Sequence, residues 1–199
     1  MIRLGVLKVI LGVYFNTFLR VKVEGQENVP AEGRVLILPN HTGILDMFMI
    51  GYKVPRMVHW MAKAELFKNK LFGKILSFYG AYPVNRGAHD TSAAKKTYEL
   101  LEKGEAVGIF PQGTRAKKGK PIPRAKSGAI KYAVGTDTLV VPVSIWGNKR
   151  IFGKVYVKFG EAFKFPQPAE ETKYSNEEYL KMAQQLMDDI YAVTKQENK

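Results

Sequence analysis

The chain has 199 residues, of which 46% are hydrophobic and 12% aromatic. This composition suits one globular domain with a sizeable core and argues against a disordered polypeptide. The absence of cysteine excludes disulfides, thiol nucleophiles and metal sites with thiolate ligands, and it fits a reducing compartment. The net charge is +13, from 31 basic and 18 acidic side chains, which favours a polyanionic partner such as nucleic acid, anionic lipid or a phosphorylated substrate.

The first 20 residues are mostly apolar and predict a helix. The run without charged residues, Val9 to Leu19, is shorter than the roughly 20 residues that a bilayer crossing requires. No small-residue cleavage site follows it, which argues against a secretory signal. The polar positions do not gather on one helical face. Two interpretations stay open: the helix packs on the core, or it lies in the membrane interface with Arg3 and Lys8 reaching the head groups.

Strand and helix patterns alternate along the rest of the chain. Apolar runs bounded by turn residues predict strands at residues 21–24, 34–38, 57–61, 80–84, 106–110, 138–145 and 155–159. Helical spacing and end signals predict helices beginning near Asp46, at 66–79, at 91–103, around 129–134, and from a capping box at 175–178 to about 195. This alternation favours an α/β fold, with helices on the faces of a sheet.

His41 and Asp46 lie five residues apart, directly after the predicted strand 34–38. On one continuous helix they would point about 140° apart, so contact requires His41 in the loop and Asp46 in the first turn of the next helix. Gly43 permits the tight backbone that this needs. An aspartate bound to one imidazole nitrogen leaves the other free to take a proton from a hydroxyl group. The alternative is a helix-capping Asp46 beside an ordinary loop histidine.

Two arginines, Arg86 and Arg115, follow predicted strands, and Gly113 before Arg115 would let the backbone approach a ligand closely. The arginine side chain is a rigid fork that matches phosphate oxygens. Lys126 stands just before the predicted helix 129–134, whose N-terminus favours anions. Each charge taken alone could equally be a solvated surface group, but two arginines at strand ends downstream of the histidine and aspartate favour an anion site.

Other common catalytic patterns are missing from the sequence. The segment from Gly113 to Lys120 resembles a phosphate-binding loop, but it has five residues between its glycines and Pro121 where Ser or Thr is needed. No Gly-x-Ser-x-Gly motif is present, which argues against an acyl-serine intermediate. No group of His, Asp and Glu residues has metal-ligand spacing.

Four segments in order resemble one known family, the glycerolipid acyltransferases of the lysophosphatidic-acid acyltransferase type. They are Asn40-His41-x4-Asp46, Gly80 to Arg86, Phe110-Pro111-Gln112-Gly113-Thr114-Arg115 and Val141-Pro142-Val143. They extend over about half of the chain. The resemblance implies a single α/β domain with a mixed central β-sheet flanked by helices, like that of glycerol-3-phosphate acyltransferase. Residues 1–20 would form an apolar, membrane-associating helix, and residues 21–199 the acyltransferase domain.

The resemblance also implies a reaction, in which a fatty acyl group moves from acyl-CoA or acyl-acyl carrier protein to the sn-2 hydroxyl of 1-acylglycerol 3-phosphate, giving phosphatidic acid. His41 would be the base and Asp46 its partner. No metal, cofactor or acyl-enzyme is implied. The implied partners are the donor, lysophosphatidic acid and a phospholipid surface at the cytoplasmic face of the cell membrane, with no nucleic acid. The expected substrate-binding residues are Arg86, Gln112, Gly113, Thr114, Arg115 and Lys126.

Gln112 departs from the family pattern, which usually has glutamate at this position. Glutamine keeps one acceptor, adds a donor and loses the negative charge, and we expect it to be compatible with activity. Glycerol 3-phosphate or another lyso-lipid is an alternative acceptor. A nucleic-acid-binding protein that uses the basic segment 115–126 is an alternative from another class, although that segment lacks interleaved aromatic residues. A noncatalytic lipid-binding relative is the third interpretation.

Overall fold

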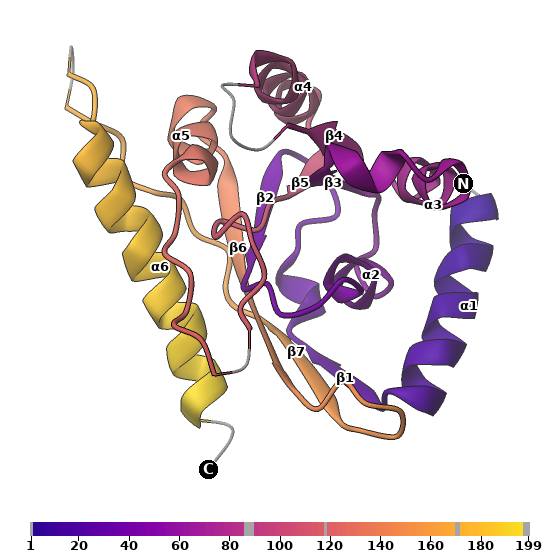
Figure 1. Ribbon diagram of the computed structural model, residues 1–199. Helices are drawn as coiled ribbons and strands as arrows, with labels where there is room; N and C mark the ends of the chain where they lie inside the picture. The colour runs from indigo at the N-terminus through magenta and orange to yellow at the C-terminus, as the bar shows by residue number, and fades with distance from the viewer. Residues whose placement is uncertain (1, 86–89, 118, 170–171, 197–199) are drawn as a thin grey trace.

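The computed structural model describes residues 2–85, 90–117, 119–169 and 172–196. The strands are β1 (Val21–Glu24), β2 (Val35–Pro39), β3 (Val58–Lys63), β4 (Tyr82–Val84), β5 (Ala106–Gly108), β6 (Leu139–Gly147) and β7 (Val155–Phe159). The α-helices are α1 (Ile2–Phe18), α2 (Asp46–Gly51), α3 (Lys70–Phe78), α4 (Thr91–Glu102), α5 (Gly128–Gly135) and α6 (Asn176–Gln196) (Figure 1). Short 3₁₀ helices span Gln26–Asn28 and Ala64–Phe67.

The strands form one seven-stranded sheet in the order β1-β7-β6-β2-β5-β3-β4. Neighbouring strands are parallel except β6 and β7, which are antiparallel. The predicted mixed sheet with flanking helices is therefore confirmed. The central strand β2 is buried along its whole length, as expected of a strand covered on both faces.

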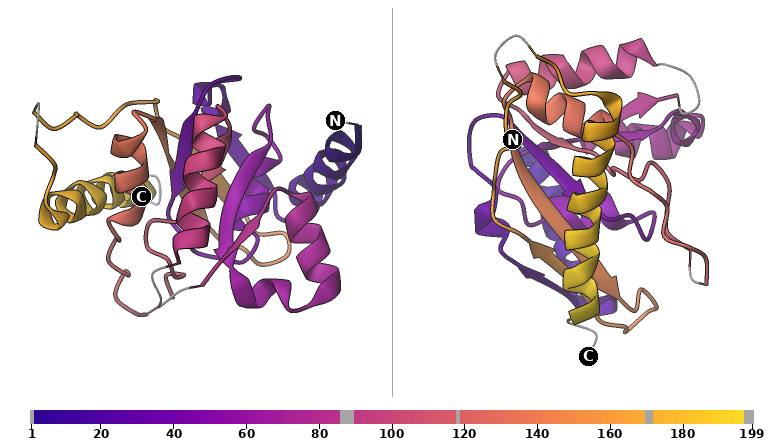
Figure 2. Two further views of the ribbon diagram at one scale, coloured as in Figure 1. Left: turned by 90° about the horizontal axis from the view of Figure 1, so that it is seen from above. Right: turned by 90° about the vertical axis from the view of Figure 1, so that its left-hand side faces the viewer.

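Successive residues of β2 point into two separate cores. Val35 and Ile37 pack into the core beneath α1, α2 and α3, whereas Leu36 and Leu38 pack into the core beneath α4, α5 and α6. Figure 2 shows these two helical layers on opposite faces of the sheet. The alternation follows from the two-residue period of a strand, and it leaves the loops at the strand ends free to build a site.

Most predicted elements are present with shifted ends, but the predicted helix 66–79 is wrong in one respect. This segment forms the 3₁₀ helix Ala64–Phe67 and then a separate helix α3 that begins after Asn69. The Asn69 side chain accepts a hydrogen bond from the backbone N–H of Phe72 at 3.0 Å, as a helix N-cap does. The apolar periodicity continues across this break because both pieces pack on the same core.

Helix α1 has two apolar faces. Phe15 is fully buried in the core together with Leu19, which follows the helix, whereas Val9 and Val13 on the outer face are 66% and 62% exposed. Lys8 does not reach outward, because its ammonium group donates to the backbone carbonyl of Val54 at 2.6 Å. Snorkelling of Lys8 to a head-group layer is therefore wrong for this structure. Over the described residues, no helix combines the length and apolarity that a bilayer crossing needs.

Candidate active site

The candidate site lies at the carboxyl ends of β2, β5 and β6, which are neighbours in the sheet. Ligand sites of open α/β sheets are commonly built at this edge. The chain leaves β2 through Asn40, whose side chain is buried and pairs with the backbone of Ile145 on β6. Its Oδ1 accepts from the Ile145 N–H at 2.7 Å, and its Nδ2 donates to the Ile145 carbonyl at 2.8 Å. This double contact holds the start of the next loop in place.

His41 and Asp46 meet in the arrangement that their spacing predicts. His41 lies in the loop after β2, and Asp46 is the first residue of α2. Nδ1 of His41 lies 2.9 Å from Oδ2 of Asp46. The ionised carboxylate accepts hydrogen bonds only, so Nδ1 carries a proton, and in the neutral imidazole the lone pair is therefore on Nε2. The His41 side chain is 13% exposed, so part of the imidazole is open to solvent.

The Asp46 carboxylate is fully buried and fully bonded. Oδ2 also accepts from the backbone N–H groups of Thr42 at 2.7 Å and Gly43 at 2.8 Å. Oδ1 accepts from the ammonium group of Lys149. Burial alone would raise the pKa of Asp46, but the hydrogen bond from His41 and the positive charge of Lys149 outweigh it and hold the pKa below its usual value. Asp46 is therefore an anion at neutral pH.

Gly43 serves this arrangement by its small size. Its φ is not in the left-handed region, so the expected need for backbone freedom is wrong. A Cβ atom at this position would lie 3.1 Å from Nζ of Lys149 and 3.3 Å from Oδ1 of Asp46. A side chain here would crowd the contact between these two charged groups, so the glycine leaves room for Lys149.

The His41 ring is fixed by an aromatic stack. It lies on Phe110 with the ring centroids 3.9 Å apart, and Phe110 in turn stacks on Trp60 of β3 at 5.4 Å. The stack needs Gly108 at the end of β5, because a Cβ there would come within 2.4 Å of the Trp60 ring. The imidazole is thus held between Phe110 and Asp46, and little rotation is open to it.

Gln112 lies under the loop rather than in an open cavity, and it is 1% exposed. Its Oε1 accepts from the backbone N–H of His41 at 3.1 Å and from the hydroxyl of Tyr191 on α6 at 3.3 Å. Its Nε2 donates to the carbonyl of Pro123 at 2.9 Å. Both halves of the amide are therefore used to join three segments of the chain, which differs from the substrate contact expected for Gln112.

The other expected binding residues surround the loop after β5. Gly113 has φ 65°, and Lys126 packs beside it, 3.3 Å from the position of a Cβ. Thr114 and Arg115 are exposed. The N–H of the next residue, Ala116, donates to the carbonyl of His41 at 2.8 Å, so this loop is tied to the histidine loop. Arg86 lies outside the described residues.

A cavity of about 630 Å³ adjoins this loop. Phe110 lines it and also stacks on His41, so the cavity and the imidazole share a wall. Lys126 and Lys131 contribute positive charge and Asp90 contributes one negative charge. Helix α5 begins at Gly128, after Ser127, whose side chain does not cap the helix N-terminus. An uncapped helix N-terminus between lysines favours an anionic group. The cavity therefore fits a ligand with a phosphate.

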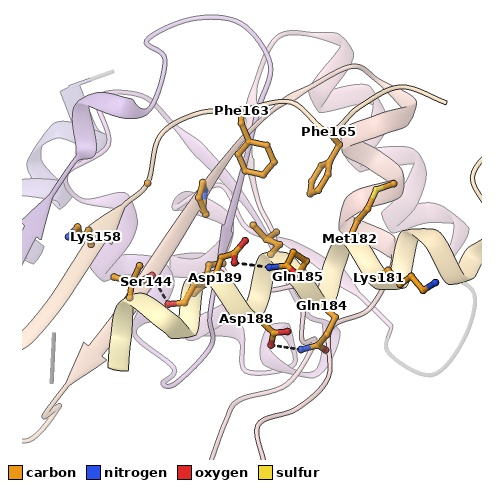
Figure 3. Close-up of a pocket in the computed structure, with 15 residues that line it drawn as sticks. Ser144, Lys158, Phe163, Phe165, Lys181, Met182, Gln184, Gln185, Asp188 and Asp189 are labelled. Atoms are coloured by element: carbon orange, nitrogen blue, oxygen red, sulfur yellow. Dashed lines mark hydrogen bonds between the residues drawn. The ribbon is translucent and has the colours of Figure 1, made fainter. Parts of the chain in front are cut away.

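A second cavity, of about 810 Å³, lies between α6, β6 and the segment after β7. Figure 3 shows Phe163 and Phe165 facing Met182 of α6 across it, with Ser144 at its edge. On its rim, Asp188 and Asp189 accept hydrogen bonds from Gln184 and Gln185 at 2.9 Å. None of the expected site residues lines this cavity, so it is separate from the histidine site.

Two side chains at the site, Lys149 and Tyr191, lie outside the sequence motifs. Lys149 lies two residues beyond the end of β6, and the parallel pairing of β2 with β6 places it at the same sheet edge as His41. Tyr191 comes from α6, which covers the sheet behind the loop after β5. Within the part of the chain that the structure describes, no group of three or more potential metal ligands occurs. The absence of a metal and of a cofactor stays a prediction.

Comparison with known proteins decides the family. A family model described as Acyltransferase matches residues 20–146. The chain belongs to the acyltransferase family. The matched region contains the strands β1 to β5, most of β6 and both loops of the site.

Relatives within the family carry more specific names. The chain is 38% identical over 147 residues to a 1-acyl-sn-glycerol-3-phosphate acyltransferase of Bacillus subtilis, covering 71% of this chain and 72% of the relative. A protein of the same name from Borreliella burgdorferi is 31% identical over 140 residues, with 68% and 55% coverage. The crystal structure of the Thermotoga maritima LPA acyltransferase PlsC superposes with a TM-score of 0.72 at 24% identity, over 97% of this chain and 79% of that one. The last comparison supports the fold.

Proposed function

We propose that this protein transfers a fatty acyl group from a thioester donor to the sn-2 hydroxyl of 1-acylglycerol 3-phosphate, giving phosphatidic acid. The observation that carries the proposal is the His41–Asp46 contact of 2.9 Å, set beside a cavity with positive charge. The names of the bacterial relatives support the same acceptor. The donor is acyl-CoA or an acylated acyl carrier protein.

The proposed reaction needs one base and one positioned acceptor. Nε2 of His41 takes the proton of the sn-2 hydroxyl as its oxygen attacks the thioester carbonyl. Collapse of the tetrahedral intermediate breaks the C–S bond, and the departing thiolate receives the proton back from His41. Asp46 holds the Nδ1–H tautomer and stabilises the imidazolium that exists between these two steps.

The acceptor phosphate is proposed to bind where cationic groups and a helix N-terminus surround the cavity. Lys126 lines the cavity, Arg115 is exposed on the loop that contacts His41, and α5 begins at Gly128. Thr114 and the predicted ligand Arg86 extend this set, with Arg86 outside the described residues. An arginine fork and backbone N–H groups both match phosphate oxygens. The phosphate would thus orient the sn-2 hydroxyl toward the imidazole.

The proposed activity is tested by measuring thiol release from acyl-CoA and from acyl-acyl carrier protein. The acceptor panel is 1-acylglycerol 3-phosphate, glycerol 3-phosphate, lysophosphatidylcholine and monoacylglycerol. We expect the highest kcat/KM with 1-acylglycerol 3-phosphate and a phosphatidic acid product. Preference for glycerol 3-phosphate or for an acceptor without a terminal phosphate would contradict the proposed acceptor. No transfer with any pair would favour the noncatalytic lipid-binding interpretation.

Gln112 provides a prediction about stability. In Gln112→Glu the new carboxylate would be buried and would face the Pro123 carbonyl that Gln112 now donates to. Both effects raise the pKa of the introduced glutamate above its unfolded value of about 4.3, against the His41 N–H and the Tyr191 hydroxyl, which donate to the other oxygen and lower it. Below the unfolded pKa the introduced side chain is a neutral carboxylic acid in both states and is tolerated. The free energy of unfolding falls as pH rises through the pKa of the folded state. We expect Tm to fall by about 5 °C at pH 8 and by much less at pH 4.

The matched control is Gln196→Glu, which makes the same chemical change at an exposed residue near the end of α6. Its Tm should follow the native protein at both pH values. We also expect Gln112→Glu to give no gain in acyl transfer, because the native amide already bonds His41 and Tyr191. Weak native turnover that Gln112→Glu strongly increases would contradict this expectation.

The proposed acceptor is a membrane lipid, and the outer face of α1 is the proposed contact with the cytoplasmic face of the membrane. This outer α1 face continues into the turn between β6 and β7, where the N–H of Phe152 donates to the carbonyl of Phe18 at 2.6 Å. The exposed apolar residues are Val6, Val9, Ile10, Val13, Tyr14, Phe18, Ile151 and Phe152. Apolar side chains of this kind can enter the interfacial layer of a bilayer. In the proposed division, residues 1–20 attach the acyltransferase domain, residues 21–199, as a peripheral or monotopic protein.

Vesicle binding tests the outer α1 face. The double variant Val9→Glu/Val13→Glu places two charges on it without touching the buried Phe15. We expect at least about tenfold weaker sedimentation with anionic phospholipid vesicles, since the apolar burial at both positions is lost. The matched control, Leu180→Glu/Ala192→Glu, changes two exposed apolar residues on α6. Equal loss in both double variants would show a general charge effect and contradict this membrane contact.

A further inference from the structure

Lys149 links the turn between β6 and β7 to the His41–Asp46 pair. It lies more than 100 positions beyond the pair in the sequence, yet its ammonium group donates to Oδ1 of Asp46 and to Oγ1 of Thr42. The Lys149 side chain is 26% exposed, whereas Asp46 is 0% exposed. The lysine therefore reaches inward from the surface to a buried carboxylate.

The contact divides the two oxygens of Asp46 between two kinds of partner. Oδ2 faces His41 and the N–H groups of Thr42 and Gly43. Within the described ranges, the hydrogen-bond partner of Oδ1 is Lys149. Removal of Lys149 would leave half of a buried anion without a donor, which is strongly unfavourable. The lysine thus fixes the orientation of the carboxylate that in turn fixes the imidazole.

The charges lead to a second effect. With His41 neutral, Asp46 and Lys149 sum to zero; when His41 takes a proton, the cluster gains one positive charge. Without Lys149, no neighbouring positive charge would offset the Asp46 carboxylate. Its attraction for the imidazolium would be stronger, which favours protonation of His41. A base must be neutral to accept the substrate proton. The positive charge of Lys149 therefore opposes protonation of His41 before the substrate hydroxyl gives up its proton.

From this geometry, and on the basis of the proposed function, we infer that Lys149 is a positioning residue that completes a His41–Asp46–Lys149 cluster. It holds the carboxylate in place and keeps His41 in its neutral, proton-accepting form at lower pH than Asp46 alone would allow. Lys149 itself does not contact the reacting atoms. A Cβ at Gly43 would lie 3.1 Å from Nζ of Lys149 and crowd it. The glycine in this loop therefore supports a cluster that includes Lys149.

Two other titratable or charged groups that the described residues bring to the site, Arg115 and Tyr191, do not change charge over the relevant range. Arg115 is on the loop whose Ala116 bonds the His41 carbonyl, and arginine stays protonated. Tyr191 on α6 contacts Gln112, and burial raises its pKa, so its hydroxyl stays neutral. Among the described residues facing the pair from the other packed elements, Lys149 is therefore the charge whose removal tests the inference.

The experiment compares native protein with Lys149→Gln, which keeps a hydrogen-bond donor but removes the charge. The NMR titration of the His41 ring and the acid limb of the kcat/KM–pH profile are both measured. We expect both to move upward by about 1 pH unit in Lys149→Gln, which lowers kcat/KM about tenfold on the acid side. Lys149→Arg keeps the charge and should leave both near their native positions.

Several controls separate this role from a structural one. Lys154→Met removes a charge from an exposed residue of the same turn and should leave the titration unchanged. The ring of His59, which lies 3.8 Å from Glu105 on the sheet, should titrate identically in native protein and Lys149→Gln. Thermal melting reports folding. If Lys149→Gln does not fold, Lys149→Ala is a second neutral variant, because its small side chain at this partly exposed position leaves room for water to donate to Oδ1 of Asp46. A lower rate at every pH with an unmoved titration would overturn the inference.

The NMR measurement also separates this inference from the proposed function. A shifted His41 titration in a protein that transfers no acyl group to any acceptor would overturn the proposed function and support the cluster. Normal acyl transfer with no difference between native protein and Lys149→Gln in either measurement would overturn the cluster and leave the proposed function intact.

Discussion

His41→Ala is expected to lower kcat/KM for acyl transfer about 10³-fold, within the range for loss of a general base. The imidazole has Nδ1 bound to Asp46 at 2.9 Å and its ring stacked on Phe110 at 3.9 Å between centroids. Among the residues that the structure describes, the other histidine is His59, which is on β3 and pairs with Glu105, so it cannot replace His41. KM for the acceptor should change little, since the proposed phosphate contacts come from other residues.

The fold should survive this change. The His41 backbone keeps its hydrogen bonds with Gln112 and Ala116, so we expect Tm to stay within about 3 °C of the native value. The space left between Phe110 and Asp46 can admit free imidazole, and added imidazole should restore part of the rate. His59→Ala is the matched control and should keep nearly full activity. Residual activity above about a tenth of native in His41→Ala would remove His41 from the role of base.

The His41–Asp46 contact could be predicted from the sequence because it is local. The five-residue spacing, the preceding apolar strand and the start of a helix at Asp46 together bring the two side chains to one loop. The strand order could not be predicted in the same way, since β2 pairs with β5 and β6 through residues 71 and 104 positions apart, such as Val35 with Ala106 and Val35 with Leu139. The motifs indicate a common site, but the sheet is what brings them together.

Lys149 and Gln112 show why the other contacts of the site could not be predicted from the sequence. Lys149 is one of 31 basic residues, and only the parallel pairing of β2 and β6 brings it to Asp46. Gln112 was expected at the substrate because it lies within a binding motif, yet its amide joins His41, Tyr191 and Pro123. Sequence identifies the loop, whereas the direction of each side chain depends on packing against α6.

The N-terminal helix shows a different limit of prediction from the apolar pattern of a sequence. Its even distribution of apolar residues left two interpretations, core packing and membrane contact. The structure has Phe15 in the core and Val9 on the outside of the same helix, so one apolar sequence can serve both purposes. A helix with two apolar faces has no clear amphipathic pattern, and its sequence therefore cannot tell which face is buried.

Asp46→Asn is expected to lower kcat/KM about 10³-fold, through loss of the charge that stabilises the imidazolium. The three donors on Oδ2, which are His41, Thr42 and Gly43, require the amide oxygen at that position. The amide NH₂ must then face the ammonium group of Lys149, so two donors oppose each other. We therefore expect Tm to fall as well, by about 5 °C or more.

A double variant separates these two losses. In Asp46→Asn/Lys149→Met the opposing donors are gone, so Tm should recover most of its loss relative to Asp46→Asn. Activity should not recover, because the carboxylate is still missing. The cycle of native protein, both single variants and the double variant, followed by thermal melting and kcat/KM, measures the coupling. Asp46→Asn activity within tenfold of native, or rescue of activity together with Tm, would show that Asp46 acts only by holding the loop. If kcat/KM stays low in the double variant while Tm recovers, the loss of activity comes from the chemistry of His41.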